Sequence, residues 1–259
     1  MNRIARMASA VAAVAAVVLA SVSPVAAQAP TSFTLQPGGK AVVTFEAFCT
    51  EFGQVFPSAV QLPDGVVAEP ARSALAYGVG KNYNGDAAQA LQLQYAIWQT
   101  LGTTNSPKGD ATAQDVLTNG KTAPVAPQGT SVVDAAAANQ VTLTLDSWQP
   151  IGPKVQITPT ASDNFYGRGQ ITIENTSQQA VTLFMPVGTR FPATNAAQQT
   201  MAGYATNAQV TNPQAAADPA PAQLPSTSGG ALNALLPLLA LGLLALGGTL
   251  HLARRVNSR

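Results

Sequence analysis

The chain has little of the chemistry that most enzymes use. Among its 259 residues there is one cysteine, Cys49, and one histidine, His251. A lone cysteine cannot close a disulfide within its own chain. A single histidine near the C-terminus excludes a Ser-His-Asp or Cys-His catalytic arrangement, and a His/Cys zinc cluster, in the body of the protein. We therefore expect no metal and no other cofactor.

Charged and aromatic side chains are also scarce. Lys and Arg number 13, Asp and Glu 12, and aromatic residues make up 6% of the chain. This near-neutral balance argues against nucleic acid or an anionic membrane surface as the main partner. There is no calcium-loop motif. Glu46 and Glu51 fall on opposite faces of an extended strand, so glycoside hydrolysis has no pattern in its favour.

The N-terminal residues predict export. Arg3 and Arg6 precede an Ala- and Val-rich run, and Val25-Ala26-Ala27 fits the small-residue rule for signal-peptide cleavage. Residues 1–27 are therefore expected to be a signal peptide. The alternative, an uncleaved membrane anchor, is disfavoured because the apolar run is short.

The C-terminal residues predict an anchor. Residues 207–230 lack hydrophobic periodicity and predict a disordered spacer. Residues 231–252 contain an apolar stretch long enough to cross a bilayer as a helix. The basic tail, 253–259, places the C-terminus in the cytoplasm by the positive-inside rule, and the body of the protein outside.

One helix is well marked in the first half of the chain. Asp86, with Gln89 three residues later, forms a capping box, and Gly102 supplies a C-terminal cap, so residues 87–101 predict a helix. At roughly 100° per residue, its apolar side chains gather around Gln94. A buried carboxamide costs about 1–3 kcal/mol unless it finds partners. We therefore expect a polar group to meet Gln94.

A candidate partner lies in an upstream strand. The alternation of residues 41–52 predicts a half-buried strand whose inward face includes Phe45 and Cys49. An odd cysteine in an exported protein calls for an explanation. Two interpretations stay open. Either Cys49 and Gln94 react with each other, or the thiol packs as a small hydrophobe and the amide bonds to a backbone carbonyl.

Two segments carry a resemblance to a known family. Phe48-Cys49-Thr50-Glu51 and Leu93-Gln94-Tyr95-Ala96-Ile97-Trp98 resemble the paired motif of thioester domains in Gram-positive surface adhesins. The resemblance covers about residues 41–101. It implies that Cys49 supplies the sulfur, and Gln94 the acyl group, of an internal thioester formed with loss of ammonia. An amine or hydroxyl on a surface or matrix protein would then attack the acyl carbon, with capture in place of turnover. Phe48, Tyr95 and Trp98 are expected to form the apolar pocket that keeps water away.

A second resemblance lies just before the apolar span. Leu224-Pro225-Ser226-Thr227-Ser228-Gly229-Gly230 resembles the LPxTG motif that sortases cut between Thr and Gly, with Ser228 in the place of the glycine. If a sortase accepts Ser228, Thr227 becomes a new C-terminus joined to the cell wall. If it does not, the membrane helix remains the anchor. Both alternatives place the protein on the cell surface.

Beyond a soft boundary near Thr130 the hydrophobic period changes to two. The segments predicted as strands are 141–145, 170–174 and 181–185. A polar connection at 175–179 predicts a hairpin between the last two. We expect an α+β fold, with a β-rich thioester-like domain at 31–130 around one central helix and a small antiparallel β sandwich or barrel at 131–206. The alternative is one fold completed around the helix.

These observations favour an adhesin-like surface protein, and not an enzyme, that captures its target through a Cys49–Gln94 thioester. A sortase is a further expected partner. The first alternative is a structural or binding module of the same layout that works without a thioester. The second, an extracellular hydrolase with an unrecognised carboxylate site, is weaker.

Overall fold

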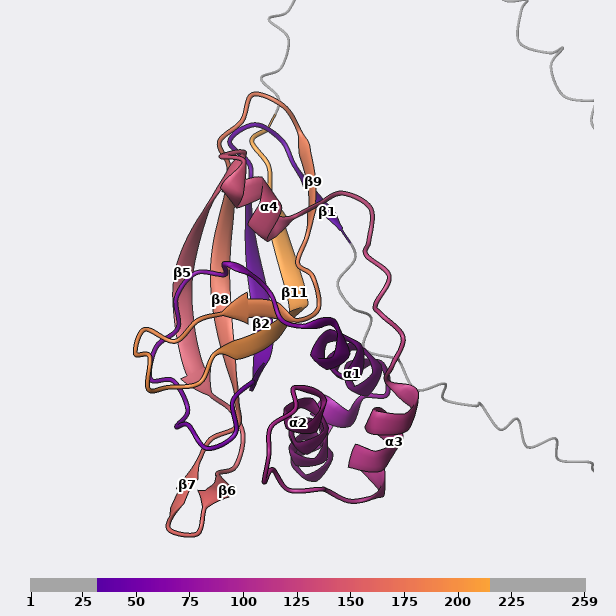
Figure 1. Ribbon diagram of the computed structural model, residues 1–259. Coiled ribbons are helices and arrows are strands. Elements are labelled where there is room, and N and C mark those ends of the chain that lie inside the picture. The colour runs from indigo at the N-terminus through magenta and orange to yellow at the C-terminus, as the bar shows by residue number, and fades with distance from the viewer. Residues whose placement is uncertain (1–31, 215–259) are drawn as a thin grey trace, which may run out of the picture. The chain divides into compact units, whose positions relative to one another are not determined.

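Long antiparallel strands dominate residues 32–214, the part of the chain that the computed structural model describes (Figure 1). The fold is α+β and β-rich, with open sheets. The expected signal peptide, sorting-like motif, membrane helix and basic tail lie outside these residues. Within residues 32–214 no helix is both long and apolar enough to cross a membrane.

The largest sheet has six strands with β2 near its centre. From edge to edge they are β3 (Gly65–Val66), β10 (Thr189–Phe191), β11 (Met201–Thr211), β2 (Lys40–Cys49), β8 (Tyr166–Asn175) and β5 (Val141–Pro150). All neighbours are antiparallel. The strand expected in the first domain is therefore paired on both sides with strands from the second half of the chain. Of the two arrangements left open, the structure has the single fold, and Thr130 does not separate two domains.

Two smaller sheets complete the β structure. In one of them β9 (Val181–Phe184) lies between β1 (Phe33–Leu35), which is antiparallel to it, and β4 (Thr130–Ser131), which is parallel. The predicted hairpin at 175–179 is therefore wrong. The Asn175 amide donates to the carbonyl oxygens of Leu35, at 3.0 Å, and Gln179, at 2.8 Å, and so directs the chain toward β1. The other small sheet is the hairpin of β6 (Val155–Thr158) and β7 (Ala161–Asp163).

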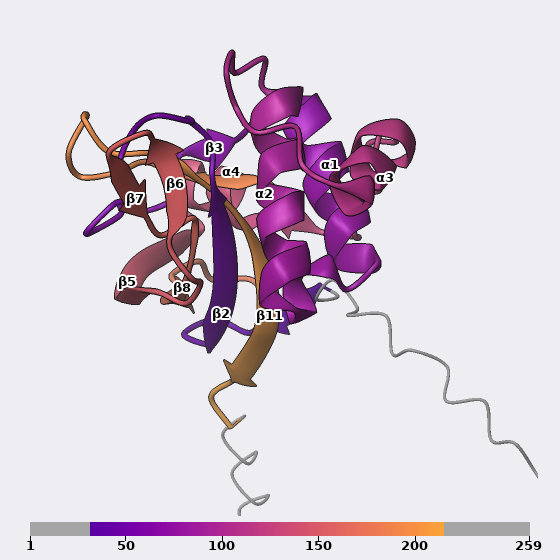
Figure 2. The same ribbon diagram turned by 90° about the horizontal axis from the view of Figure 1, so that it is seen from below.

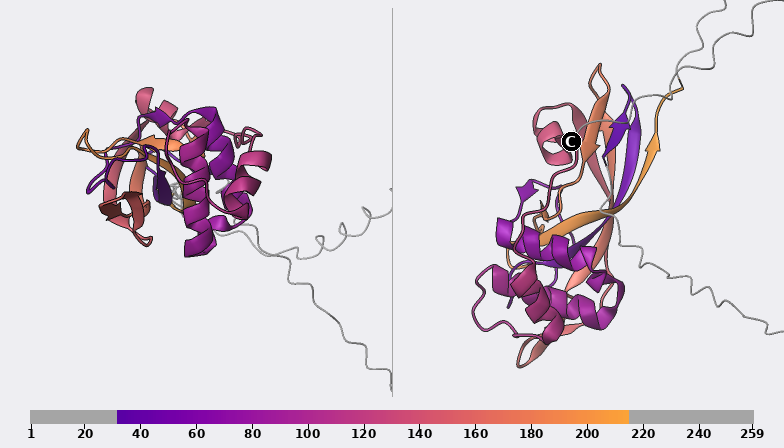
Figure 3. Two further views of the ribbon diagram at one scale, coloured as in Figure 1. Left: turned by 60° about the horizontal axis from the view of Figure 1, so that its bottom comes forward. Right: turned by 90° about the vertical axis from the view of Figure 1, so that its right-hand side faces the viewer.

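Helices gather at one end of the sheet (Figures 1 and 2). They are α1 (Glu69–Gly80), the 3-10 helix η1 (Tyr83–Gly85), α2 (Ala87–Thr100) and α3 (Ala111–Asn119). A short helix, α4 (Val132–Ala137), lies toward the other end of the sheet (Figure 3). The expectation of one central helix is right for α2 but misses α1 and α3.

Local features explain the two additional helices. Pro70 stands in the first turn of α1, where proline is tolerated. Gly78 allows α1 to approach α2 closely, since a Cβ at this position would lie 2.4 Å from Leu93 Cδ1. Asp110 caps the N-terminus of α3, because its side chain accepts from the Thr112 amide at 2.7 Å.

The last strand, β11, is not among the strands predicted from the sequence. β11 continues to Thr211, which pairs with Lys40, so the strand enters the stretch 207–230 expected to be a spacer. A bulge between Ala205 and Asn207 interrupts its alternation. Every residue from Met201 to Ala205 is also buried. Because of the bulge and this burial, the segment lacks the alternation of apolar and polar residues by which a half-buried strand is predicted.

A row of stacked aromatic rings covers part of the main sheet. Phe56 stacks on Trp148 at 5.6 Å between centroids, Trp148 on Phe45 at 6.0 Å, and Phe45 on Phe191 at 4.2 Å. The ring of Phe45 fills the space over Gly169, where an added Cβ would lie 2.4 Å from its Cζ. The glycine is needed because the ring lies so close to the backbone.

Candidate functional site

Helix α2 carries Gln94 into the interior. Asp86 accepts from the amides of Ala88, at 2.9 Å, and Gln89, at 3.1 Å, which confirms the predicted start of the helix. Gly102, with φ of 74°, follows its C-terminal end. The Gln94 side chain is fully buried, as the apolar pattern around it predicts.

Strand β2 ends at Cys49, beside α2 (Figure 2). On one side Cys49 is opposite Met201 of β11. On the other side β8 reaches only as far as Tyr166, opposite Phe48. On this side the main chain of Cys49 therefore lies just beyond the first residue of β8.

The Gln94 carboxamide occupies this position. Its Oε1 accepts from the Cys49 N–H at 2.9 Å, and its Nε2 donates to the Cys49 carbonyl oxygen at 2.8 Å. The side-chain amide thus bonds to β2 as a strand residue would. The Cys49 N–H also donates to the Phe165 carbonyl at 3.0 Å. The structure brings together the two residues that the sequence singled out, through the main chain of Cys49.

The Cys49 thiol lies beside Met201 of β11, on the side away from β8. Its Sγ lies 3.8 Å from the Met201 Sδ, and the side chain is fully buried. Burial raises the pKa of the thiol well above its ordinary value, and the negative charges of Asp163 and Glu51 raise it further. The sulfur is therefore protonated and shielded from solvent at neutral pH.

The three aromatic residues expected around the pair belong to two separate aromatic groups. Trp98 is fully buried and meets the ring of Phe52 edge-on at 4.9 Å, with Tyr95 6.1 Å away. Phe48 packs elsewhere, stacked on Tyr166 at 5.2 Å. Since successive residues of a strand point to opposite faces, Phe48 and Cys49 face away from each other. Trp98 and Tyr95 therefore pack together in α2, and Phe48 packs against the sheet.

A hollow of about 360 Å³ opens beside the strand end. Its lining consists of Thr50, Glu51, Phe52, Leu101 and Thr103. These residues follow Cys49 in the chain or lie at the C-terminal end of α2. The hollow therefore opens next to the end of β2, and neither Cys49 nor Gln94 is part of its lining.

No pattern in the sequence indicates the residue that holds residues 51–54 in place. Gln199 is fully buried, accepts from the Glu51 amide at 3.1 Å and donates to the Gln54 carbonyl at 2.7 Å. The Glu51 carboxylate accepts from the Thr200 amide at 2.7 Å. Gln199 lies in a polar loop before β11, and only the three-dimensional arrangement brings it to Glu51.

The buried carboxylate of Glu46 has a structural role. Its Oε1 accepts from Arg168 and its Oε2 from the Tyr204 hydroxyl, both at 2.6 Å. Burial, followed by the charge and hydrogen bond of Glu46, raises the pKa of Tyr204. Both carboxylate oxygens are thus engaged in holding β8 and β11 against β2.

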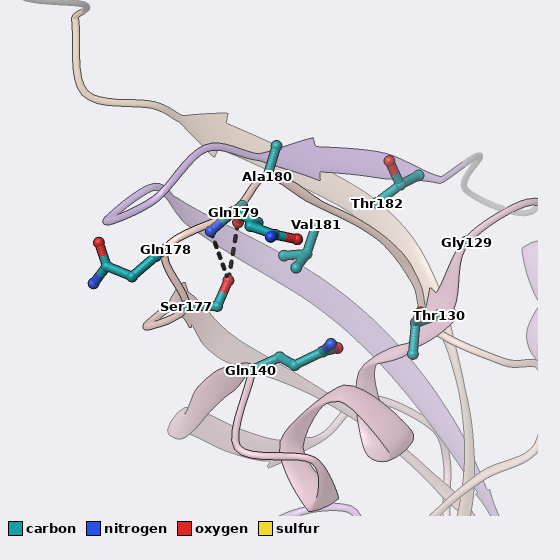
Figure 4. Close-up of a pocket in the computed structure, with 9 residues that line it drawn as sticks. All are labelled: Gly129, Thr130, Gln140, Ser177, Gln178, Gln179, Ala180, Val181 and Thr182. Atoms are coloured by element: carbon teal, nitrogen blue, oxygen red, sulfur yellow. Dashed lines mark hydrogen bonds between the residues drawn. The ribbon is translucent and has the colours of Figure 1, made fainter.

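A second hollow, of about 510 Å³, lies between β9 and the segment that leads into α4 (Figure 4). The side chains in its lining carry hydroxyl, carboxamide or small apolar groups and no ionisable group. Gln140 and Gln179 extend toward the space between the two segments, whereas Gln178 points away. This lining suits hydrogen bonding and offers no acid or base.

Within residues 32–214 no three His, Cys, Asp or Glu side chains are grouped as metal ligands. The sorting-like residues Leu224, Pro225, Thr227 and Ser228 lie outside the described residues. Comparison with protein families, with curated proteins and with solved structures found no match to this chain.

Proposed function

We propose that this chain is an exported surface protein that captures a nucleophile through an internal thioester between Cys49 and Gln94. The observation that carries the proposal is the buried Gln94 carboxamide, which bonds to the main chain of Cys49 at 2.9 and 2.8 Å. The motif resemblance supports it independently, since it pairs the same two residues.

Thioester formation requires the Cys49 Sγ to attack the Gln94 Cδ. An S–C bond replaces the C–N bond, and the amide nitrogen leaves as ammonia with the thiol proton. The Cys49 N–H already donates to Oε1, the oxygen on which negative charge develops. The raised pKa of the thiol slows the attack, but the bond forms only once in each molecule.

Capture reverses the roles of these groups. An amine or hydroxyl of the target attacks the Gln94 acyl carbon, Cys49 leaves, and the proton of the nucleophile passes to the sulfur. The hollow beside Cys49 offers the route of entry, and Glu51 is the single ionisable side chain in its lining. Its carboxylate can accept the proton of the nucleophile during the attack.

Intact mass of the exported protein, without reductant, tests the proposal. The wild type is expected to be lighter than its sequence by one ammonia and to gain one methylamine on treatment. Cys49→Ala should have its full sequence mass and gain nothing. Because both proteins undergo the same processing, their difference is independent of where the signal peptide is removed.

Two glutamine variants sharpen this test. Gln94→Glu removes the carboxamide that reacts, whereas Gln89→Glu makes the same chemical change at an exposed position of α2. Only Gln89→Glu should still lose ammonia and take up methylamine. A wild-type mass equal to the sequence, with no methylamine adduct, would overturn the proposal.

Anchoring belongs to the same proposal. Residues 1–27 are removed on export, and either the membrane helix at 231–252 or a sortase product ending at Thr227 holds the protein at the surface. The C-terminal peptide of cell-wall-extracted protein decides between the two. A peptide ending at Thr227 indicates sortase cleavage, and peptides beyond Ser228 indicate the membrane anchor.

The second hollow favours an alternative function, non-covalent binding of a neutral, hydroxyl-rich ligand. Its carboxamide and hydroxyl groups can both donate and accept hydrogen bonds, and no charge in the lining has to be desolvated. In NMR titrations with neutral oligosaccharides, the side-chain amides of Gln140 and Gln179 should shift. Gln179→Leu should abolish the shift, and Gln178→Leu, whose side chain points away, should not. Unchanged spectra would exclude this function for the ligands tested.

A further inference from the structure

One buried hydrogen-bond donor beside the candidate site has no acceptor. Trp98 is fully buried, and its indole Nε1 makes no hydrogen bond within the described residues. The other tryptophan, Trp148, donates its Nε1–H to the Pro57 carbonyl at 3.0 Å. Buried polar groups are nearly always paired, so an unpaired one calls for an explanation.

The position of Trp98 in α2 suggests what this donor serves. Trp98 lies four residues after Gln94, one helical turn away on the same buried face. Helical side chains lean toward the N-terminus, so the indole lies over the turn that carries Gln94. On its outer side it contacts the edge of Phe52, which lines the hollow beside Cys49. The indole therefore packs against Phe52 and lies over the turn of α2 that carries Gln94.

The Gln94 carboxamide oxygen, one helical turn earlier, can accept a further hydrogen bond. A carbonyl oxygen can accept two hydrogen bonds, and Gln94 Oε1 accepts one, from the Cys49 N–H. When Sγ bonds to Cδ, the acyl group moves toward the sulfur, and its oxygen changes position relative to that N–H. A second donor on α2, the Trp98 Nε1–H, can bond to the oxygen in its new position.

Building on the proposed function, we propose that the Trp98 Nε1–H donates to the acyl oxygen of Gln94 in the thioester and in the tetrahedral intermediates that precede and follow it. In formation, the S–C bond replaces C–N and ammonia leaves. In capture, the bond from the target nitrogen to Cδ replaces S–C and the thiol is restored. Both reactions place negative charge on the same oxygen, and the indole stabilises it in both.

The sharpest variant replaces Trp98 with 3-benzothienylalanine, which keeps the shape of the indole and exchanges N–H for sulfur. Methylamine capture by the protein should slow by about 10²- to 10³-fold, the usual effect of losing one oxyanion donor. With ¹³C-labelled glutamine, the infrared carbonyl stretch of the thioester should rise in frequency, because a hydrogen bond to the oxygen is lost. A merely structural role for Trp98 would leave this stretch unchanged.

The matched control is the same replacement at Trp148, whose N–H bonds to Pro57 away from the pair. It should leave capture rate and carbonyl stretch as in the wild type. Trp98→Phe removes both the N–H and part of the ring, so it is compared only after its thermal transition shows that it folds.

The outcomes separate the two proposals. Suppose that the wild type loses ammonia and that replacing Trp98 with 3-benzothienylalanine leaves capture rate and carbonyl stretch unchanged. This result overturns the role of Trp98 and leaves the thioester standing. A wild type that retains its full sequence mass overturns both.

Discussion

Gln94 of α2 and Cys49 of β2 are joined by two hydrogen bonds between a side-chain amide and a main chain, at 2.9 and 2.8 Å. The carboxamide completes the edge of β2 where β8 has not begun. As long as the carboxamide is intact, both hydrogen bonds contribute to stability. The stability prediction that follows uses proteins in which the thioester is absent.

In a Cys49→Ala background, Gln94→Met should lower the free energy of unfolding by about 1–3 kcal/mol, because the carbonyl of residue 49 is left buried without its donor. Gln89→Met, at an exposed position, should change it by less than about 0.5 kcal/mol. Urea denaturation of the three proteins measures the difference. Equal midpoints would show that the amide is not held as described.

Tyr204→Phe should destabilise the sheet, because the hydroxyl donates to the buried carboxylate of Glu46 at 2.6 Å. Hydrogen bonds to charged groups contribute about 1.5–3 kcal/mol. Tyr166→Phe is the control, since its hydroxyl makes no hydrogen bond within residues 32–214 and it lies on the same sheet. Chemical denaturation at neutral pH should separate the two variants.

Tyr204 should also lower the free energy of unfolding at alkaline pH. The pKa of Tyr204 is raised in the folded state, so that state holds the phenolic proton more tightly than the unfolded state. The stabilisation is complete below the ordinary value of 10.0 and is lost as pH rises above it. The free energy of unfolding should fall less steeply with pH in Tyr204→Phe than in the wild type. Identical slopes would contradict the coupling.

Tyr83 should lose its phenolic proton at a higher pH than an ordinary tyrosine. Its hydroxyl donates to Asp115 at 2.7 Å, and this hydrogen bond is the main cause that raises the pKa of Tyr83 to about 12. In Asp115→Asn the carboxylate charge is gone, so the pKa should return toward 10.0. Carbon-13 NMR of the tyrosine rings follows the titration, with Asp134→Asn, a change in α4, as the control.

The contact between Tyr83 and Asp115 should also affect the stability of the protein at acid pH. Hydrogen bonds from Tyr83 and Asn119 lower its pKa, so their stabilising effect is present above the ordinary value of 3.8 and is lost as pH falls below it. Asp115→Asn should remove this component from the acid unfolding curve. An unchanged curve would show that the contact does not form in solution.

Gly169→Ala should destabilise the protein by about 1–3 kcal/mol, because the new methyl group overlaps the ring of Phe45. Gly80→Ala tests the same change where nothing lies within 4 Å, at the exposed end of α1. It should be neutral or stabilising by up to about 1 kcal/mol. Thermal unfolding of both variants checks the pair, and equal losses would argue against the packing of Phe45.

Local signals in the sequence were sufficient for α2 and for the burial of the site. The cap at Asp86 and the glycine at 102 mark the helix within the sequence itself, and the apolar residues around Gln94 show which face is buried. Such signals act over a few residues and do not depend on the rest of the fold. The expectation that Gln94 meets a polar group required no knowledge of the sheet.

Contacts between residues far apart in the chain determine the features that the sequence did not predict, such as α1 and the position of β9. The glycines and the proline of α1 indicate a loop, yet Gly78 is required there because Leu93 packs against it. The strand β9 leaves β8 for a separate sheet because Asn175 bonds to Leu35, more than a hundred residues earlier in the chain. Partners so distant in sequence leave no periodic signal at either position.

The pairing of β11 with β2 fixes an order of events as the protein folds. Cys49 is opposite Met201, from which it is separated by 152 residues, and contacts of such separation form late. A chain delivered from its N-terminus presents Cys49 and Gln94 well before β11 exists. We therefore expect the thiol to stay open to solvent until β11 docks against β2, so that the last strand of the described chain completes its enclosure.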